Sequence, residues 1–177
     1  MIPFNEFFDT QVDDIVIAHN TLNGIFIDRH VENIEKLENT IENAPIIRSI
    51  TRRQVNNKVC HQLGRIIPFE NQYLLLAFSH FEENQAKLTH SQYEACLRTM
   101  WREISRTYAN RPVFLPLLGS GITRFDNPVI KTEQQLLKCL LCTLKTSNVT
   151  INQKISIVLT PSAIKKVNLY ELKKQFS

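Results

Sequence analysis

The sequence lacks a hydrophobic run long enough to cross a membrane. Its longest uninterrupted apolar stretch extends only from Tyr73 to Phe78, whereas a spanning helix needs about 20 apolar residues. No positively charged segment followed by an apolar one opens the chain, so a secretory signal peptide is not indicated either. These two absences lead us to expect a domain that works in the cytoplasm.

Charge of one sign is not in large excess. Lys and Arg number 21 against 17 for Asp and Glu, which gives a net charge of +4 at pH 7. Nucleic-acid-binding domains usually carry a stronger and more clustered positive charge, so we expect no nucleic-acid partner. A small anionic ligand is compatible with this balance.

Cysteine is also sparse, at four residues, and metal-binding patterns are missing. Cys139 and Cys142 form a C-x-x-C pair inside an apolar helical stretch, without a second Cys or His pair beside it. The five histidines are scattered without the spacing of metal ligands. We expect free thiols on a helix face, with a redox pair as the alternative, and no metal site.

The sequence does contain enough apolar residues, 43% of 177, for one sizeable core. Segments with strand-like and helix-like patterns alternate along it. The patterns predict strands over 1–5, 64–70, 72–81, 112–118 and 154–161, and helices over 24–44, 88–109, 127–144 and 169–176. Such alternation is typical of α/β proteins, and we expect a single three-layer α/β/α domain over residues 1–177 with a mixed central sheet.

Two of the only four glycines stand close together in VFLPLLGSGITR, directly after a strand-like segment. The turn that follows such a strand is where main-chain amides can converge on a phosphate. Gly119 and Gly121 lack Cβ atoms, so they can take positive φ angles and let a diphosphate approach the main chain. A plain tight turn is the alternative interpretation. The segment is not a Walker loop, and Arg124 occupies the third glycine position of a dinucleotide fingerprint.

The segment VFLPLLGSGITR resembles the diphosphate-binding loop of macro domains, which bind ADP-ribose. Together with IPFNEFFDTQVDD, TLNGIFID and LLLAFSHFEENQAKL, it resembles the macro domains of Thoeris antiphage effectors, and the resemblance covers nearly the whole chain. It implies a sensor that binds an ADP-ribose-derived nucleotide made by a TIR-domain partner. Binding would activate an attached effector and change its self-association. The resemblance also implies a longer protein, with transmembrane helices ahead of residue 1.

The same resemblance implies where the ligand binds. The diphosphate loop would comprise Leu117, Leu118, Gly119, Ser120, Gly121, Ile122, Thr123 and Arg124, with Arg124 as a charge partner at the rim. The opposing loop would comprise Asn5, Phe8, Asp9, Thr10, Leu22, Asn23 and Gly24. Ser79 or His80, which follow an interior strand, would touch the distal ribose, and Thr160 with Pro161 would border the adenine.

Hydrolytic macro domains carry an Asn-Ala-Ala-Asn segment and a glycine triplet in the first ligand loop. This chain has neither, and Leu22-Asn23-Gly24 contains a single glycine. We therefore expect a binding module with no catalytic residue and no cofactor beyond its nucleotide ligand. An ADP-ribosyl hydrolase is the alternative function, and an interaction domain with an empty cleft is a third.

Two further groups of residues have a functional and a structural interpretation. Asp13 and Asp14, beside Asp9, could form a carboxylate cluster, but loop aspartates commonly cap turns, and we expect a ligand role for Asp9 alone. Aromatic and aliphatic residues at helical spacing could stack on adenine but are expected to form core: Tyr93, Leu97, Trp101 and Ile104.

Overall fold

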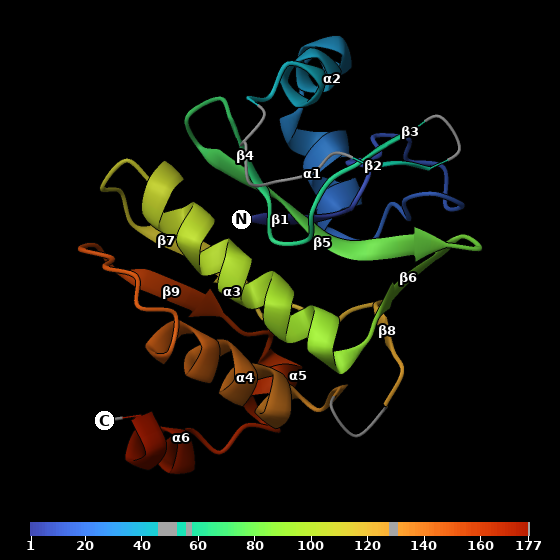
Figure 1. Ribbon diagram of the computed structural model, residues 1–177. Coiled ribbons are helices and arrows are strands. Elements are labelled where there is room, and N and C mark those ends of the chain that lie inside the picture. The colour runs from blue at the N-terminus through green and yellow to red at the C-terminus, as the bar shows by residue number, and fades with distance from the viewer. Residues whose placement is uncertain (46–52, 56–57, 128–130, 177) are drawn as a thin grey trace.

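The computed structural model describes residues 1–45, 53–55, 58–127 and 131–176 (Figure 1). Its strands are β1 (Ile2–Asn5), β2 (Arg53–Val55), β3 (Lys58–Cys60), β4 (Ile66–Phe69), β5 (Tyr73–Glu82), β6 (Gln85–Leu88), β7 (Val113–Pro116), β8 (Arg124–Phe125) and β9 (Ile155–Val158). Its helices are α1 (Leu22–His30), α2 (Ile34–Glu42), α3 (His90–Thr107), α4 (Glu133–Lys145), α5 (Pro161–Ile164) and α6 (Leu169–Phe176).

The long strand β5 is the centre of a mixed sheet. It pairs in parallel with β1 and antiparallel with β4 and β6, and β8 extends the sheet in parallel with β6. Strands β7 and β9 form a parallel pair. The amino group of Met1, just before β1, donates to the Phe114 carbonyl of β7 over 2.7 Å, which joins the pair to the edge of β1. The predicted mixed sheet is confirmed.

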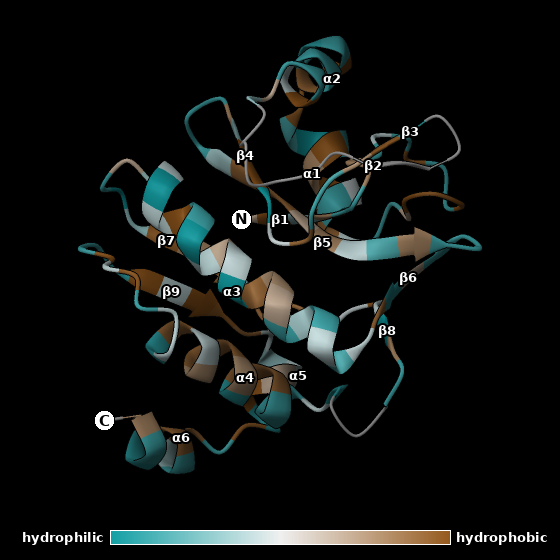
Figure 2. Ribbon diagram, in the orientation of Figure 1, coloured by the Kyte–Doolittle hydropathy of each residue, from teal (hydrophilic) through white to brown (hydrophobic). Residues whose placement is uncertain are grey.

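Helices cover the two faces of β5. Successive side chains of a strand point to opposite faces. Leu76 and Phe78 belong to a buried apolar cluster with α3 and α4, whereas Leu75 and Ala77 belong to a second cluster with α1 and α2. Figure 1 shows α3 crossing in front of the strands, and Figure 2 shows polar residues on the outer turns of α2 and α6. The fold is therefore the expected three-layer α/β/α arrangement.

The strand predictions are confirmed at β1, β4, β5, β7 and β9, but β7 is not buried on both faces, contrary to what its apolar sequence had led us to expect. Val113 and Leu115 of β7 face the core, but Phe114 between them is 60% exposed. The predicted core role of the α3 residues is also confirmed, since Tyr93, Leu97, Trp101 and Ile104 are fully buried. Helix α3 begins at His90, inside the predicted range 88–109, and its N-cap Thr89 forms a capping box with Gln92.

The predicted boundaries of two helices are wrong. The single helix expected over 24–44 is two helices, because Asn33 is extended and accepts a hydrogen bond from Lys36 N as the N-cap of α2. The helix expected from Asn127 begins at Glu133, after the N-cap Thr132. Pro128, part of that prediction, lies outside the described residues. At Asn33 the capping side chain decided the boundary against the apolar periodicity, whereas in the later helix Thr132, and not Asn127, is the cap.

The cysteines are free thiols, as expected. Burial raises the pKa of the Cys96 thiol, and it raises that of Cys139 to about 12. A thiol with so high a pKa stays protonated near neutral pH, which disfavours the redox alternative for Cys139 and Cys142. No helix in the described part of the chain has the length and apolar character needed to cross a bilayer.

Candidate functional site

A cleft of about 540 Å³ opens at the carboxyl ends of β1 and β7. Four segments form it: the end of β1, the loop before α1 with the first turn of that helix, the β5–β6 hairpin, and the loop after β7. Its lining residues are 3–5, 14–18, 20–23, 78, 79, 81, 84–86 and 116–124. Ligands of open α/β sheets bind at this edge, so the cleft is the candidate functional site.

The two glycines after β7 differ in geometry. Gly119 has a φ of 86°, and a Cβ added there would lie 3.0 Å from the Phe125 ring and 3.2 Å from Leu136. Gly121 does not have a positive φ, and a Cβ added there would meet no protein atom within 4 Å. The prediction of positive φ is therefore correct for Gly119 and wrong for Gly121. The missing Cβ of Gly121, a residue that lines the cleft, leaves open space and does not relieve strain.

The tip of this loop leaves main-chain donors unused. Leu117 O accepts from Ser120 N at 3.3 Å and from Ser120 Oγ at 2.7 Å, which closes a tight turn. Within the residues that the structure describes, the N–H groups of Gly121 and Ile122 have no protein acceptor. Exposed N–H groups beside a glycine form the kind of concavity that binds anions.

Tyr93 of α3 supports the loop from the core. Its hydroxyl donates to Leu118 O at 3.0 Å, immediately before Gly119, and lies 3.5 Å from Leu136 O. Its ring meets Phe125 edge to face, with 5.4 Å between centroids. Burial raises the pKa of the Tyr93 hydroxyl well above its ordinary value, so the hydroxyl keeps its proton and remains a donor. The loop is therefore anchored to the core on one side and open to the cleft on the other.

Across the cleft lies the N-terminus of α1. Leu22, Asn23 and Gly24 were assigned to the opposing ligand loop, with a helix predicted from Gly24 onward, and all three form the first turn of this helix. Thr21 caps it by accepting from Gly24 N at 3.2 Å. A Cβ on Gly24 would lie 2.3 Å from Ala18 O, so this glycine allows the loop before α1 to approach the helix. The first turn holds no acidic residue, and the positive end of the helix dipole is uncompensated there.

The loop before α1 is held by two aspartates, as the turn-capping interpretation predicted. Asp13 Oδ1 accepts from Ile15 N at 2.9 Å and from Val16 N at 2.7 Å. Asp14 Oδ1 accepts from His19 N at 3.0 Å. These bonds arrange the loop so that its residues 14–18 line one wall of the cleft.

Asp13 should therefore control the order of this wall. The N–H groups of Val16 and Ile15 hold the pKa of its carboxyl below the ordinary value. A lowered pKa means that the ordered loop favours the ionised form, so the stabilisation is present above about pH 4 and is lost as pH falls through the lowered pKa. We expect Asp13→Ala to accelerate amide hydrogen exchange at Ile15 and Val16 at pH 7. Asp13→Asn keeps an accepting oxygen and should exchange more slowly than Asp13→Ala; equal rates in the alanine variant and the wild type would contradict the assignment.

Asn5 lies at the cleft, but its polar atoms are used within the protein. Its Oδ1 accepts from Phe7 N at 3.1 Å and from Asp9 N at 3.2 Å, and its Nδ2 donates to Asp9 Oδ2 at 2.9 Å. Asp9 also pairs with Lys58 at 2.7 Å. These bonds close the turn after β1. Asn5 therefore shapes the cleft by fixing this turn, and its amide is already hydrogen-bonded within the protein.

Several residues expected at the ligand lie elsewhere. Phe8 is buried against Phe4 and His61, and Thr10 donates to Glu38 of α2. With Asp9 they line another cavity, between this turn and α2. Thr160 caps α5 and Pro161 begins that helix. In the described part of the chain none of these residues lines the cleft, and neither do Gly24 and His80. The predicted residues that do line it are Asn5, Leu22, Asn23, Ser79, Leu117, Leu118, Gly119, Ser120, Gly121, Ile122, Thr123 and Arg124.

The β5–β6 hairpin supplies a wall that the sequence analysis missed. Phe78, Phe81, Asn84, Gln85 and Ala86 line the cleft from it. Glu83 and Asn84 connect the strands with φ angles of 52° and 57°, as in the two-residue turns that match the twist of a hairpin. The sequence signal for this hairpin was the Glu83-Asn84 pair directly after a strand pattern. It is weak, because the strongest signal for a two-residue hairpin turn is Asn-Gly.

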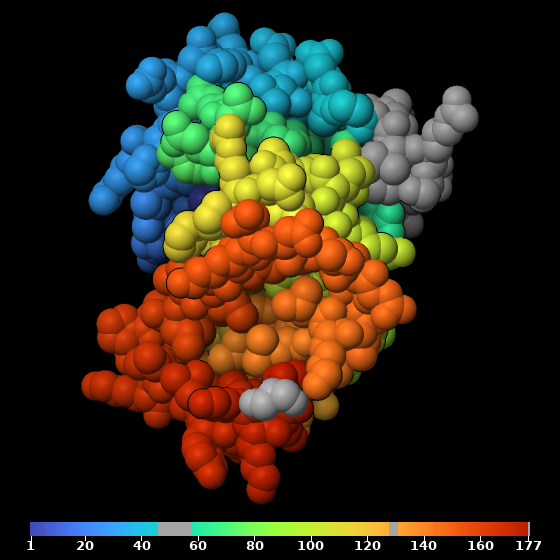
Figure 3. All heavy atoms as spheres, turned by 90° about the vertical axis from the view of Figure 1, so that its left-hand side faces the viewer, coloured from blue at the N-terminus to red at the C-terminus, as the bar shows by residue number. Residues whose placement is uncertain are grey.

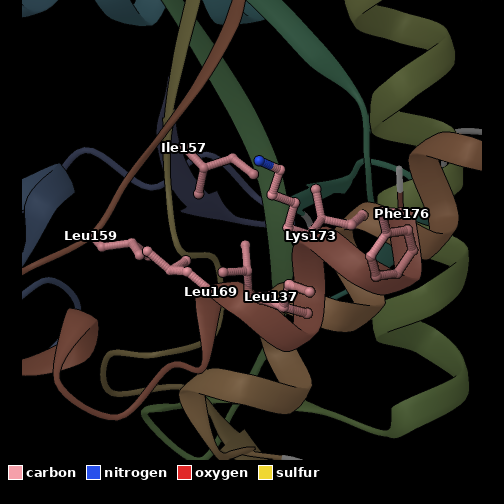
Figure 4. Close-up of a pocket in the computed structure, with 8 residues that line it drawn as sticks. Leu137, Ile157, Leu159, Leu169, Lys173 and Phe176 are labelled. Carbon is pink, nitrogen blue, oxygen red and sulfur yellow. The ribbon is translucent and has the colours of Figure 1, made fainter.

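Another cavity, of about 410 Å³, lies between α4, β9 and α6. Figure 3 shows a hollow on this side of the molecule, among atoms of the C-terminal third of the chain. Figure 4 shows that Leu137, Ile157, Leu169 and Phe176 line the cavity with the stem of Lys173. Its walls are apolar apart from that lysine, so it lacks the convergent polar groups that would orient a nucleotide. In the described residues no group of three or more His, Cys, Asp or Glu side chains could hold a metal ion.

Comparison with known proteins agrees with the fold. The family described as Thoeris protein ThsA, Macro domain, matches residues 1–160. The Thoeris protein ThsA of Bacillus amyloliquefaciens (strain Y2) is 36% identical over 182 aligned residues, which cover 98% of this chain and 61% of the relative. The chain thus spans about three fifths of that relative's length. The macro-domain resemblance noted in the sequence is confirmed, and the chain belongs to the family of ThsA macro domains.

Proposed function

We propose that the cleft binds an ADP-ribose-derived nucleotide and that this binding is the domain's function. The observation that supports the proposal best is that main-chain donor groups belong to residues on two walls of one cleft. The free N–H groups of Gly121 and Ile122 lie on one side, and the uncompensated N-terminus of α1 lies on the other. Both features favour a diphosphate. Arg124 at the rim adds the one basic side chain among the described lining residues.

We propose binding without hydrolysis. Asp14 is the one acidic side chain among the described lining residues, and its Oδ1 already accepts from His19 N. No histidine, cysteine or glutamate appears in the described lining. A hydrolase needs a group placed to activate water, and Asp14 is the one carboxylate in the described lining that could serve as such a group. An ADP-ribosyl hydrolase is the competing function.

In the longer protein that the relative's length suggests, we propose that the domain is a sensor. Its ligand would be a signal made by a TIR-domain enzyme, and binding would activate an attached effector in antiphage defence, with a change in self-association. The relative carries the name of a Thoeris protein and extends well beyond the part matched here. We also propose that this longer protein carries a membrane anchor.

Calorimetry followed by chromatography separates these functions. Titration of the 177-residue chain with ADP-ribose and with an ADP-ribose conjugate should give saturable heat for at least one of them. The bound compound should then be recovered intact after prolonged incubation with a catalytic amount of protein. Repeated cleavage of the conjugate would make the hydrolase the better assignment, and absence of heat with every ADP-ribose compound would favour an interaction domain.

A further inference from the structure

A buried carboxylate lies directly behind the cleft. Glu6 follows the cleft residue Asn5 and is 5% exposed. Its Oε2 accepts from the Cys60 thiol at 2.6 Å and from His80 Nδ1 at 2.8 Å, and Phe81 N lies 3.4 Å from its Oε1. The donors come from β3 and β5, so one side chain links three strands.

The carboxylate is kept ionised by these donors. Burial acts to raise the pKa of Glu6, but the hydrogen bonds from His80 and Cys60 outweigh it and hold the pKa below its ordinary value. Donation to a carboxylate requires that Cys60 keeps its proton, which is the opposite of the thiolate that a nucleophile needs. The cluster therefore has the character of a fixed structural acceptor and not of a second catalytic centre.

The main chain of Glu6 binds the residues next to these donors. Its N–H donates to Ser79 O at 2.8 Å, and its carbonyl accepts from His61 N at 2.8 Å. Beside it the pairing of β1 with β5 shifts, because Phe4 is opposite Ala77 whereas Asn5 is opposite Ser79. Irregularities of this kind leave the ladder locally unpaired and commonly occur next to binding sites.

We infer that Glu6 is a positioning residue for the cleft, because it clamps the irregular end of β1 against β5. Asn5, Ser79 and Phe81 line the cleft, and each is next to Glu6 or to an atom that Glu6 binds. With the clamp intact, these three residues have one fixed arrangement. The inference rests on the proposed function as far as the ligand is concerned, but the clamp itself is independent of what the cleft binds.

Glu103 provides a matched control. It is also a buried carboxylate, 7% exposed, and it lies 3.3 Å from a main-chain donor, Ile66 N, and 3.5 Å from Arg65. It does not line the cleft or contact the end of β1 within the described residues. Glu103→Gln and Glu6→Gln should therefore both lower the melting temperature, but only Glu6→Gln removes contacts at the end of β1.

The test measures ADP-ribose affinity and amide hydrogen exchange in the 177-residue chain. Glu6→Gln should weaken ADP-ribose binding by about tenfold, as is common when a supporting residue behind a site is changed, while Glu103→Gln should leave the affinity unchanged. Exchange at Asn5 and at Ser79 to Phe81 should accelerate in Glu6→Gln and stay as in the wild type in Glu103→Gln. Cys60→Ser, which keeps a donor to Glu6, should exchange more slowly in this region than Cys60→Ala.

The two readouts separate the inference from the proposed function. If the wild type does not bind ADP-ribose, the proposed function fails, and the exchange pattern alone decides whether Glu6 clamps the strands. Wild-type exchange at Asn5 and Ser79 in Glu6→Gln would overturn the inference, as would equal changes of affinity in Glu6→Gln and Glu103→Gln. If Glu6→Gln does not fold, the comparison of Cys60→Ala with Cys60→Ser gives the same decision.

Discussion

Replacing Gly121 by valine is expected to abolish ADP-ribose binding while leaving the stability of the domain almost unchanged. A Cβ at this position meets no protein atom within 4 Å, and the residue does not have a positive φ. The free energy of unfolding should therefore change by no more than about 0.5 kcal/mol, as at other unstrained surface positions. The added methyl groups would occupy space beside the free N–H groups of the loop, where we place the diphosphate. Calorimetry and thermal melting of the same preparation check both parts.

Gly119→Ala is the control for this prediction. Its φ of 86° is unfavourable for alanine, and its Cβ would press on the Phe125 ring and Leu136. We expect it to lower the free energy of unfolding by about 1–3 kcal/mol, because the strain lies within the protein. Binding retained in Gly121→Val would remove the diphosphate from this loop. A large loss of stability in Gly121→Val would instead show that the protein itself needs glycine there.

The layers of the fold were predictable because burial leaves a direct pattern in the sequence. The run from Tyr73 to Phe78 is apolar on both faces, and in the structure its alternate residues enter two clusters on opposite sides. Thr89 caps α3 through a capping box with the Gln three residues later, and this local pattern can be read directly from the sequence. Helix ends were less predictable where a capping residue competes with periodicity, since Asn33 interrupts a spacing that continues through it.

The cleft was predictable in full on one side and only in part on the other, where Asn5, Leu22 and Asn23 line it as expected. The loop from Leu117 to Arg124 follows a strand directly, so its place at the sheet edge follows from the strand. The opposite wall depends on how a chain without regular structure turns, and Asp13 and Asp14 determine that through bonds to particular N–H groups. Phe8, Asp9 and Thr10 are residue types that often bind nucleotides. In the structure, however, Phe8 is buried in the core and Thr10 donates to Glu38 of α2.

The hydroxyl of Tyr93 should matter both to stability and to the shape of the cleft. Tyr93→Phe removes the donor to Leu118 O and leaves a buried carbonyl without it. Loss of one partner of a buried hydrogen bond typically costs about 1–3 kcal/mol, and removal of the whole ring in Tyr93→Ala should cost about 3–5 kcal/mol. Since Leu118 precedes Gly119, we also expect a few-fold weaker binding of ADP-ribose to Tyr93→Phe. Urea titration and calorimetry measure the two effects.

Thr143→Val is the matched control for Tyr93→Phe. Thr143 Oγ1 accepts from Trp101 Nε1 at 3.1 Å in the same core, on α4, and it does not contact the glycine loop in the described structure. Removing its hydroxyl leaves a buried indole N–H unpaired, so the loss of stability should be similar. Affinity for ADP-ribose should stay as in the wild type, because the loop after β7 keeps the hydrogen bond from Tyr93 to Leu118 O. If both variants weaken binding in proportion to their instability, Tyr93 acts only through the core; if Tyr93→Phe alone does so, the hydroxyl holds the loop in its binding geometry.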